Sequence, residues 1–170
     1  MYVAFDQLPA TARVWIYQAS RPLTSEETVH LLPTLARFAE DWTSHGRNLL
    51  ASAEVLHQYF LVLGLDEAVA GASGCSIDAS VRFVAQLEQQ LGLELLEKSR
   101  LAFMQHGEVR LVDRRELQAA TASASVTPDT LYFDNTLATK GELDTIWPRP
   151  ASETWLVRYF KTTEKNPGLA

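Results

Sequence analysis

LASAEVLH (50–57) and YFLVLGL (59–65) are two apolar runs separated by a single residue. Each run has the length and the apolar content of a β-strand. A tight turn at His57 and Gln58 would join the two runs, although glutamine is not a favoured turn residue. The pattern predicts a β-hairpin, and the elements on either side of it decide the fold.

Upstream of this hairpin the sequence predicts a strand and a helix. ARVWIYQA (12–19) is rich in β-branched and aromatic residues, which favour a strand. Thr24 and Glu27 have the spacing of a capping box, which begins a helix that we expect to end at Gly46. Pro33 lies inside this helix and would kink or restart it, because proline removes a backbone hydrogen bond.

Downstream of the hairpin the sequence predicts a helix and then another hairpin. The helix follows GASGCSID (71–78), carries its apolar side chains on one stripe, and has Gly92 as its stop. RLAFMQ (100–105) and EVRLV (108–112) read as strands joined by a His-Gly turn. The sequence thus adds one helix and two strands to the elements before it.

Residues 12–105 therefore have the order β-α-β-β-α-β, which is typical of a split βαβ or ferredoxin-like unit. In such a unit two helices cover one face of an antiparallel sheet, so the predicted class is α+β. The rest of the chain predicts a C-terminal β/α extension that ends in a helix over 152–160. We expect a single domain over residues 1–160 and a flexible tail over 161–170.

Composition and charge narrow the class of protein. The chain has 170 residues, of which 46% are hydrophobic and 21% charged, as in an ordinary globular protein. The formal net charge is −6 and the basic residues are dispersed, so we expect no nucleic-acid partner. One cysteine excludes an intrachain disulfide. The start of the chain does not read as a signal peptide, and no apolar run would span a bilayer, so we expect a cytoplasmic protein without a membrane partner.

GASGCSID (71–78) is the stretch whose residue types best suit a binding site. Its glycines allow close approach to the backbone, and the helix that follows offers unpaired amides and positive dipole density to an anion. In the predicted topology this loop shares one end of the sheet with the loop after the first helix and with the end of the fourth strand. The candidate ligand-binding residues are Gly74, Ser76, Asp78, Arg47 and His106.

Cys75 gives the same stretch a second interpretation, in which it is catalytic. A thiol at a helix start and close to a cation is favoured as the reactive thiolate, and His45 would serve as its base. A third interpretation is structural: Ser76 or Asp78 caps the helix, and Cys75 fills a small apolar gap. All three interpretations stay open at this point.

Other chemistries have weaker support. Ser73 lies in GASGC, which lacks the final glycine of the G-x-S-x-G motif of serine hydrolases. The four histidines have neither H-x-H nor H-E-x-x-H spacing, so no metal site and no cofactor is predicted. Trp147 in WPRP is interpreted as a packing residue, with the wall of a pocket or partner surface as the alternative.

WTSHG (42–46), GASGCSID, FDQLPATARVWIYQ (5–18) and TKGEL (139–143) resemble an uncharacterised family of bacterial proteins over most of the chain. Members of that family often carry the automatic label "ABC transporter ATPase", which implies a nucleotide-binding domain. A P-loop needs a lysine directly after its last glycine, whereas GASGCSID has no lysine and Lys140-Gly141 has the reverse order. The residues therefore do not predict a P-loop ATPase, and the resemblance implies no activity.

Two classes of function follow from these residues. The first is a module that binds a small anionic ligand, or that presents a sheet edge or an apolar patch to another protein or, as a homodimer, to a second copy. The alternative is a thiol-dependent enzyme that uses Cys75 with a nearby histidine.

Overall fold

The computed structural model describes residues 1–160, which form two compact units. The first unit contains Met1–Lys98 and Asn135–Trp147, and the second contains Ser99–Asp134 and the described residues from Pro148 onward. The expected single domain over residues 1–160 stays a prediction. The expected tail over 161–170 lies outside the described residues.

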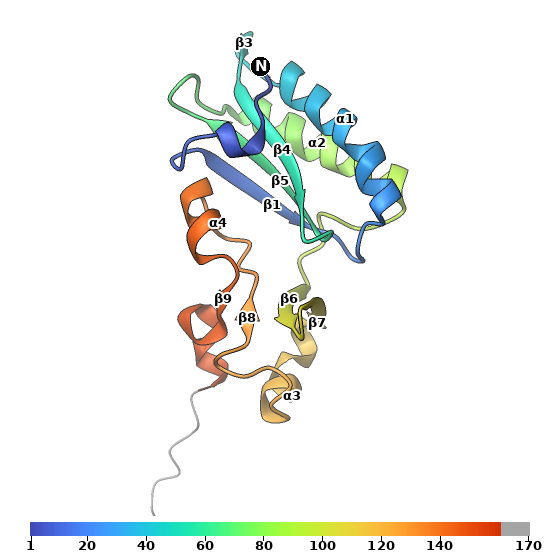
Figure 1. Ribbon diagram of the computed structural model, residues 1–170, viewed down its shortest axis with the longest axis vertical. Coiled ribbons are helices and arrows are strands. Elements are labelled where there is room, and N and C mark those ends of the chain that lie inside the picture. The colour runs from blue at the N-terminus through green and yellow to red at the C-terminus, as the bar shows by residue number, and fades with distance from the viewer. Residues whose placement is uncertain (161–170) are drawn as a thin grey trace, which may run out of the picture. The chain divides into compact units, whose positions relative to one another are not determined.

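The first unit is built on a three-stranded antiparallel sheet with the strand order β1-β5-β4 (Figure 1). Its strands are β1 (Arg13–Gln18), β4 (Leu50–Leu56) and β5 (Phe60–Asp66). His57, Gln58 and Tyr59 connect β4 to β5, and the first two have positive φ, 50° and 59°. Two such residues make the turn whose twist matches that of a hairpin, so the predicted hairpin and its turn are confirmed.

Two helices, α1 (Ser25–Asp41) and α2 (Gly74–Leu91), cover one face of this sheet (Figure 1). The rings of Phe38 and Phe83 stack between the helices with their centroids 4.1 Å apart. The predicted capping box at the start of α1 is present, and α1 continues through Pro33. Gly92 caps α2 in the left-handed conformation, as expected.

The predicted end of the first helix at Gly46 is wrong, because α1 ends at Asp41. The next residues form a small hairpin of β2 (Thr43–Ser44) and β3 (Arg47–Asn48). Its turn residues, His45 and Gly46, have φ values of 51° and 76°. Glycine therefore acts here as a turn residue of a hairpin, not as the stop of a helix.

The opposite face of the sheet is covered by the short helix η1 (Phe5–Gln7) and by α4 (Lys140–Ile146). A Cβ at Gly64 of β5 would lie 2.5 Å from Leu8 Cδ1 and 3.3 Å from Phe5 Cε2, so glycine lets this segment pack on the strand. Because β5 is covered on both faces, its apolar run is continuous and its residues from 60 to 65 are all buried.

The α+β class with antiparallel sheets is confirmed, but the ferredoxin-like unit over 12–105 is not. The strand expected to complete it, β6 (Arg100–Gln105), pairs with β7 and β8 of the second unit. The edge of β1 where a fourth strand would pair is occupied by another segment: Val14 donates its N–H to the carbonyl of Ala138 at 2.9 Å. That edge therefore has no room for β6.

The second unit contains a four-stranded sheet with the order β7-β6-β8-β9. The predicted hairpin of β6 and β7 (Glu108–Asp113) is confirmed, and the short strands β8 (Leu131–Tyr132) and β9 (Arg149–Pro150) follow. Phe103, Leu117 and Leu156 are fully buried in its core.

Short helices complete the second unit. They are η2 (Arg114–Glu116), α3 (Leu117–Ala122), η3 (Ala151–Glu153) and η4 (Trp155–Tyr159). The helix expected over 152–160 is thus two 3₁₀ segments. No helix within residues 1–160 has the length and the apolar content that crossing a membrane requires.

Arg21 connects the start of α1 to the end of α2. Its guanidinium donates two hydrogen bonds to the Glu27 carboxylate, at 2.8 and 2.9 Å, and a third to the carbonyl of Leu91 at 2.8 Å. Glu27 also accepts the N–H of Thr24 in the capping box. The Arg21 guanidinium and this N–H lower the pKa of Glu27 to about 2.

We expect Glu27→Gln to destabilise the protein at neutral pH and to lose this effect in acid. A lowered native pKa stabilises the fold above the unfolded value of 4.5 and ceases to do so as pH falls through about 2. Urea unfolding of both proteins between about pH 7 and pH 3 measures the difference. Glu26→Gln is the matched control, because Glu26 is also in the first turn. If the difference in unfolding free energy between the native protein and Glu27→Gln does not change with pH, the prediction is contradicted.

Candidate functional site

The stretch 71–78 forms the start of α2, and its hydroxyl groups cap that helix. Ser73 is the N-cap: its Oγ accepts the N–H of Ser76 at 3.2 Å, and Ser76 Oγ accepts the N–H of Ser73 at 2.8 Å. The expected caps were Ser76 or Asp78, so the cap lies earlier than predicted. Ser76 is 1% exposed, and its N–H is already bonded within the protein. The N–H of Ser76 is therefore not available to an external anion.

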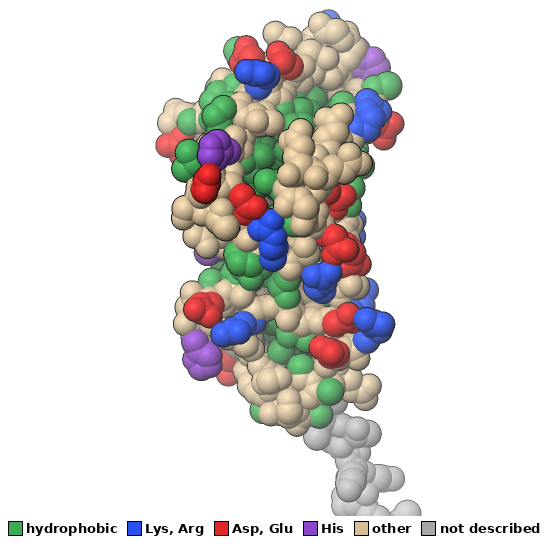
Figure 2. Space-filling model, turned by 90° about the vertical axis from the view of Figure 1, so that its right-hand side faces the viewer, with side chains coloured by type: hydrophobic (Ala, Val, Ile, Leu, Met, Phe, Trp, Pro, Cys, Tyr) green, Lys and Arg blue, Asp and Glu red, His purple; other side chains and the backbone are tan. Residues whose placement is uncertain are grey.

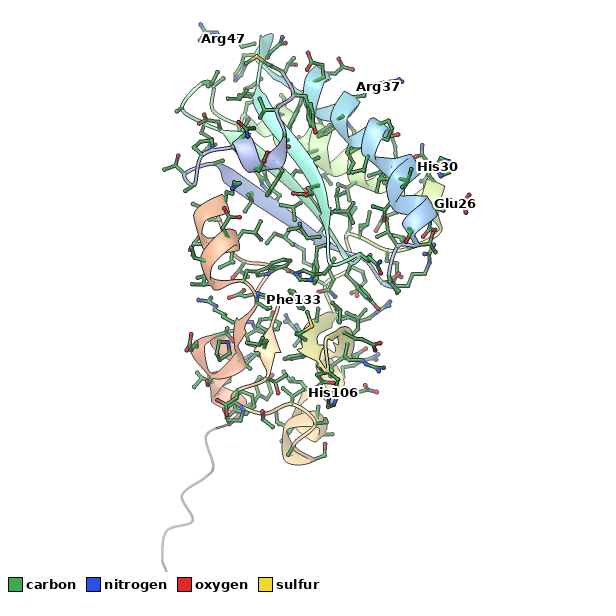
Figure 3. All side chains as sticks on the ribbon, viewed as in Figure 1. Glu26, His30, Arg37, Arg47, His106 and Phe133 are labelled. Carbon is green, nitrogen blue, oxygen red and sulfur yellow. The ribbon has the colours of Figure 1, made fainter. Side chains whose placement is uncertain are left out.

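The β2–β3 hairpin lies beside this helix start. Trp42, which is buried, donates its Nε1–H to the carbonyl of Ser76 at 2.9 Å. His45 and Arg47 are exposed on the hairpin, and Cys75 is exposed on α2. Figure 3 shows Arg47 pointing outward. Within residues 1–160 no hydrogen bond or ion pair joins Cys75 to either of these side chains.

The other predicted ligand-binding residues belong to two different units of the chain. Gly74 and Asp78 are exposed on the first turns of α2. His106 belongs to the second unit, where it has a φ of 52° in the turn between β6 and β7 (Figure 3). The sequence grouped it with 71–78 only because β6 was expected to be the fourth strand of the first sheet.

A cavity of about 570 Å³ lies in the first unit, along the edge of β4 that does not pair with β5. Its lining comes from four segments: the N-terminal residues through η1, Leu32 of α1, the second half of β4 with its turn, and α4 with the residue after it. The side chains that matter for its chemistry are Phe5, Asp6, Glu54, Lys140, Asp144 and Trp147.

The cavity wall formed by α4 is held close to the residues that precede β1. Thr139 and Glu142 make a capping box, and the N–H groups of Lys140 and Gly141 donate to the carbonyls of Ala12 and Ala10, both at 2.8 Å. A Cβ at Gly141 would lie 3.1 Å from the Ala10 oxygen, so glycine permits this approach. These contacts hold Lys140 in place before any ligand binds.

The charged groups of the cavity are mostly acidic. Lys140 is 8% exposed, and its Nζ donates to Asp144 Oδ2 at 2.6 Å. Glu54 is half-buried on β4, and its pKa is raised by burial and by the charges of Asp6 and Asp144, while Lys140 lowers it. The net shift makes the charged form of Glu54 less favourable than that of a glutamate in water.

Aromatic groups form another part of the wall. Trp147 packs edge-on against Phe60 with the ring centroids 4.8 Å apart, and its ring lies 5.7 Å from that of His57. The ring of Phe5 lies 5.8 Å from the Lys140 ammonium. Burial lowers the pKa of His57 below its usual 6.5, so this imidazole is neutral at neutral pH.

Sequence reasoning missed most of this cavity. It did not predict α4, although Thr139 and Glu142 have the spacing of a capping box. It noted Trp147 as a pocket wall in its alternative interpretation, and Trp147 does line the cavity. Glu54 carried a signal of its own, because it is the one charged residue in the apolar run 50–57.

We compared the chain with known proteins. No family model, curated protein or solved structure matches the chain. The resemblance to an uncharacterised bacterial family therefore stays a prediction. Within residues 1–160 no three His, Cys, Asp or Glu side chains are grouped so as to hold a metal ion.

We expect iodoacetamide to alkylate Cys75 in the folded protein without denaturant, because this side chain is exposed. We expect His45→Ala to leave the rate unchanged, since no hydrogen bond joins the two residues. Mass spectrometry measures the rate, with the urea-unfolded chain as reference. A native rate far above the unfolded one that falls in His45→Ala would instead support a thiol-dependent enzyme.

Proposed function

We propose that the protein is a small-molecule binding module whose ligand occupies the cavity along β4. The observation that carries the proposal is a concave site in which the half-buried Glu54 lies among charged side chains and aromatic walls. Binding sites for small molecules have volumes of roughly 300 to 1,000 Å³ and combine apolar walls with a few placed polar groups. The cavity has this size and this composition.

The unpaired edge of β4 supplies further polar groups. Ala51 donates its N–H to the carbonyl of Met1 at 3.1 Å and accepts the N–H of Val3 at 3.0 Å, so its backbone groups point away from β5. Backbone direction repeats every two residues in a strand, so those of Ala53 and Val55 point the same way. Ala53 lines the cavity, where its N–H and carbonyl can orient a bound molecule.

This proposal keeps the expected class of binding module but changes the place of the site. At residues 71–78 the hydroxyl groups are used by the helix cap, whereas the cavity groups face a hollow. Cys75 does not line the cavity, so the proposed function makes no use of the thiol.

A fragment screen by ¹H–¹⁵N NMR on the full chain tests the proposal. We expect small aromatic amines, alcohols and acids to include binders that shift the amide signals of Glu54, Lys140 and Trp147. Trp147→Leu removes an aromatic wall but keeps an apolar contact with Phe60, and we expect it to weaken binding about tenfold.

Val81→Ala is the matched control, because Val81 is a large apolar residue exposed on α2, outside the cavity. We expect it to leave affinity unchanged. The absence of any binder that shifts the cavity signals, up to about 10 mM, would overturn the proposed function.

A further inference from the structure

We infer that the ligand of this cavity carries a positive charge, as a protonated amine attached to a flat apolar group. The inference depends on the proposed function and names the chemical class of its ligand. It rests on the charge, the pairing and the aromatic content of the cavity wall.

The cavity has more acids than the protein itself neutralises. Asp6, Glu54 and Asp144 are its three carboxylates, and Lys140 is its one Lys or Arg side chain. The Lys140 ammonium donates to Asp144. Within residues 1–160 neither Asp6 nor Glu54 makes an ion pair. A bound cation would supply the charge that these two carboxylates lack.

Lys140 does not make the cavity a site for an anion. Its Nζ is 2.6 Å from Asp144 Oδ2, so an anion would have to compete with this carboxylate for the ammonium. The same anion would also share the cavity with the carboxylates of Asp6 and Glu54, which would repel it. Burial lowers the pKa of His57, which disfavours a positive charge on its imidazole.

The surroundings favour a cation as well. The first unit contains seven Lys and Arg residues and fourteen Asp and Glu residues, a formal net charge of −7. Such a field attracts cations toward the unit from a distance. Figure 2 shows Lys and Arg side chains scattered singly among the acids on the face that it draws. The carboxylates of the cavity and the net charge of the first unit therefore both favour a cation.

The aromatic side chains of the wall fit the rest of the ligand. Tyr2, Phe5 and Trp147 line the cavity. Ring faces attract ammonium groups and also pack against flat apolar groups. A ring joined by a short chain to an ammonium would place its charge at Glu54 and its ring against the aromatic wall.

Three matched probes test the inference on the full chain by NMR titration. They are phenethylammonium, 2-phenylethanol and 3-phenylpropionate, which share a ring and a two-carbon chain and differ in the charge of the end group. We expect phenethylammonium to bind at least about tenfold more tightly than the alcohol, and the carboxylate to bind most weakly.

Glu54→Gln keeps the shape of the side chain and removes its charge. We expect this variant to lose about tenfold in affinity for phenethylammonium and to bind the alcohol as the native protein does. Asp41→Asn is the control, because it removes one exposed acid of the first unit outside the cavity. An equal loss in Asp41→Asn would mean that net charge, not Glu54, attracts the cation.

A pH titration gives a second readout that does not depend on a variant's stability. The charged groups that face Glu54 are Asp6 on η1, Lys140 and Asp144 on α4, and His57 is at the end of its own strand. Affinity for phenethylammonium should fall as pH drops, and the fall should begin above the usual pKa of 4.5, since burial and the two acids raise the pKa of Glu54. The alcohol should show no such fall.

The outcomes separate the two claims. If 3-phenylpropionate binds more tightly than phenethylammonium and shifts the amide signals of the cavity, the inferred positive charge of the ligand is wrong. The proposed small-molecule site would then still stand. Equal affinities for all three probes would lead to the same conclusion. Failure of every probe and of the fragment screen to shift the cavity signals would overturn the proposed function and the inference together.

Discussion

Strand β5 is buried on both faces, and the architecture of the first unit follows from this constraint. Apolar side chains on both sides of a strand need two covering layers, because either face left in water would forfeit about 25 cal/mol for each Å² of apolar surface. Helices α1 and α2 supply one layer, and η1 with α4 supplies the other. Gly64 permits the second layer, since a larger side chain there would meet Leu8. The segment 135–147 must therefore return to this unit from far along the chain.

The two edges of the sheet are covered to different extents, and this difference creates the cavity. The edge of β1 is covered by the residues before α4, which bond to Val14. The edge of β4 pairs only briefly with the N-terminal residues, through Tyr2 and Ala51, before that segment turns away into η1. A hollow is left between the departing segment, the strand and α4. Partial pairing of one edge is thus enough to leave a cavity without any dedicated loop.

Local signals account for what the sequence predicted correctly. The hairpin at residues 50–66, the capping box of α1 and the stop at Gly92 each depend on residues within a few positions of one another. The partner of β6 does not, because the edge of β1 bonds to residues near 138, which are distant in sequence, and β6 pairs with β8 instead. The cavity was hidden for the same reason, because Glu54 and Lys140 meet only through tertiary packing. Trp147 could be named as a candidate wall, but its neighbours could not.

Residues 71–78 and the cavity differ in whether the fold already uses their polar groups. Glycines and serines before a helix suit an anion site, but a helix start uses the same residues to satisfy its own amides, and Ser73 and Ser76 do so here. A binding site needs polar or charged groups that are not already hydrogen-bonded or ion-paired within the protein. We propose that Glu54 is such a group, because it is half-buried in the cavity with Asp6 and Asp144 and makes no ion pair within residues 1–160. The cavity has three carboxylates and one lysine, which already donates to Asp144, and this surplus of acids is the physical argument for a cationic ligand.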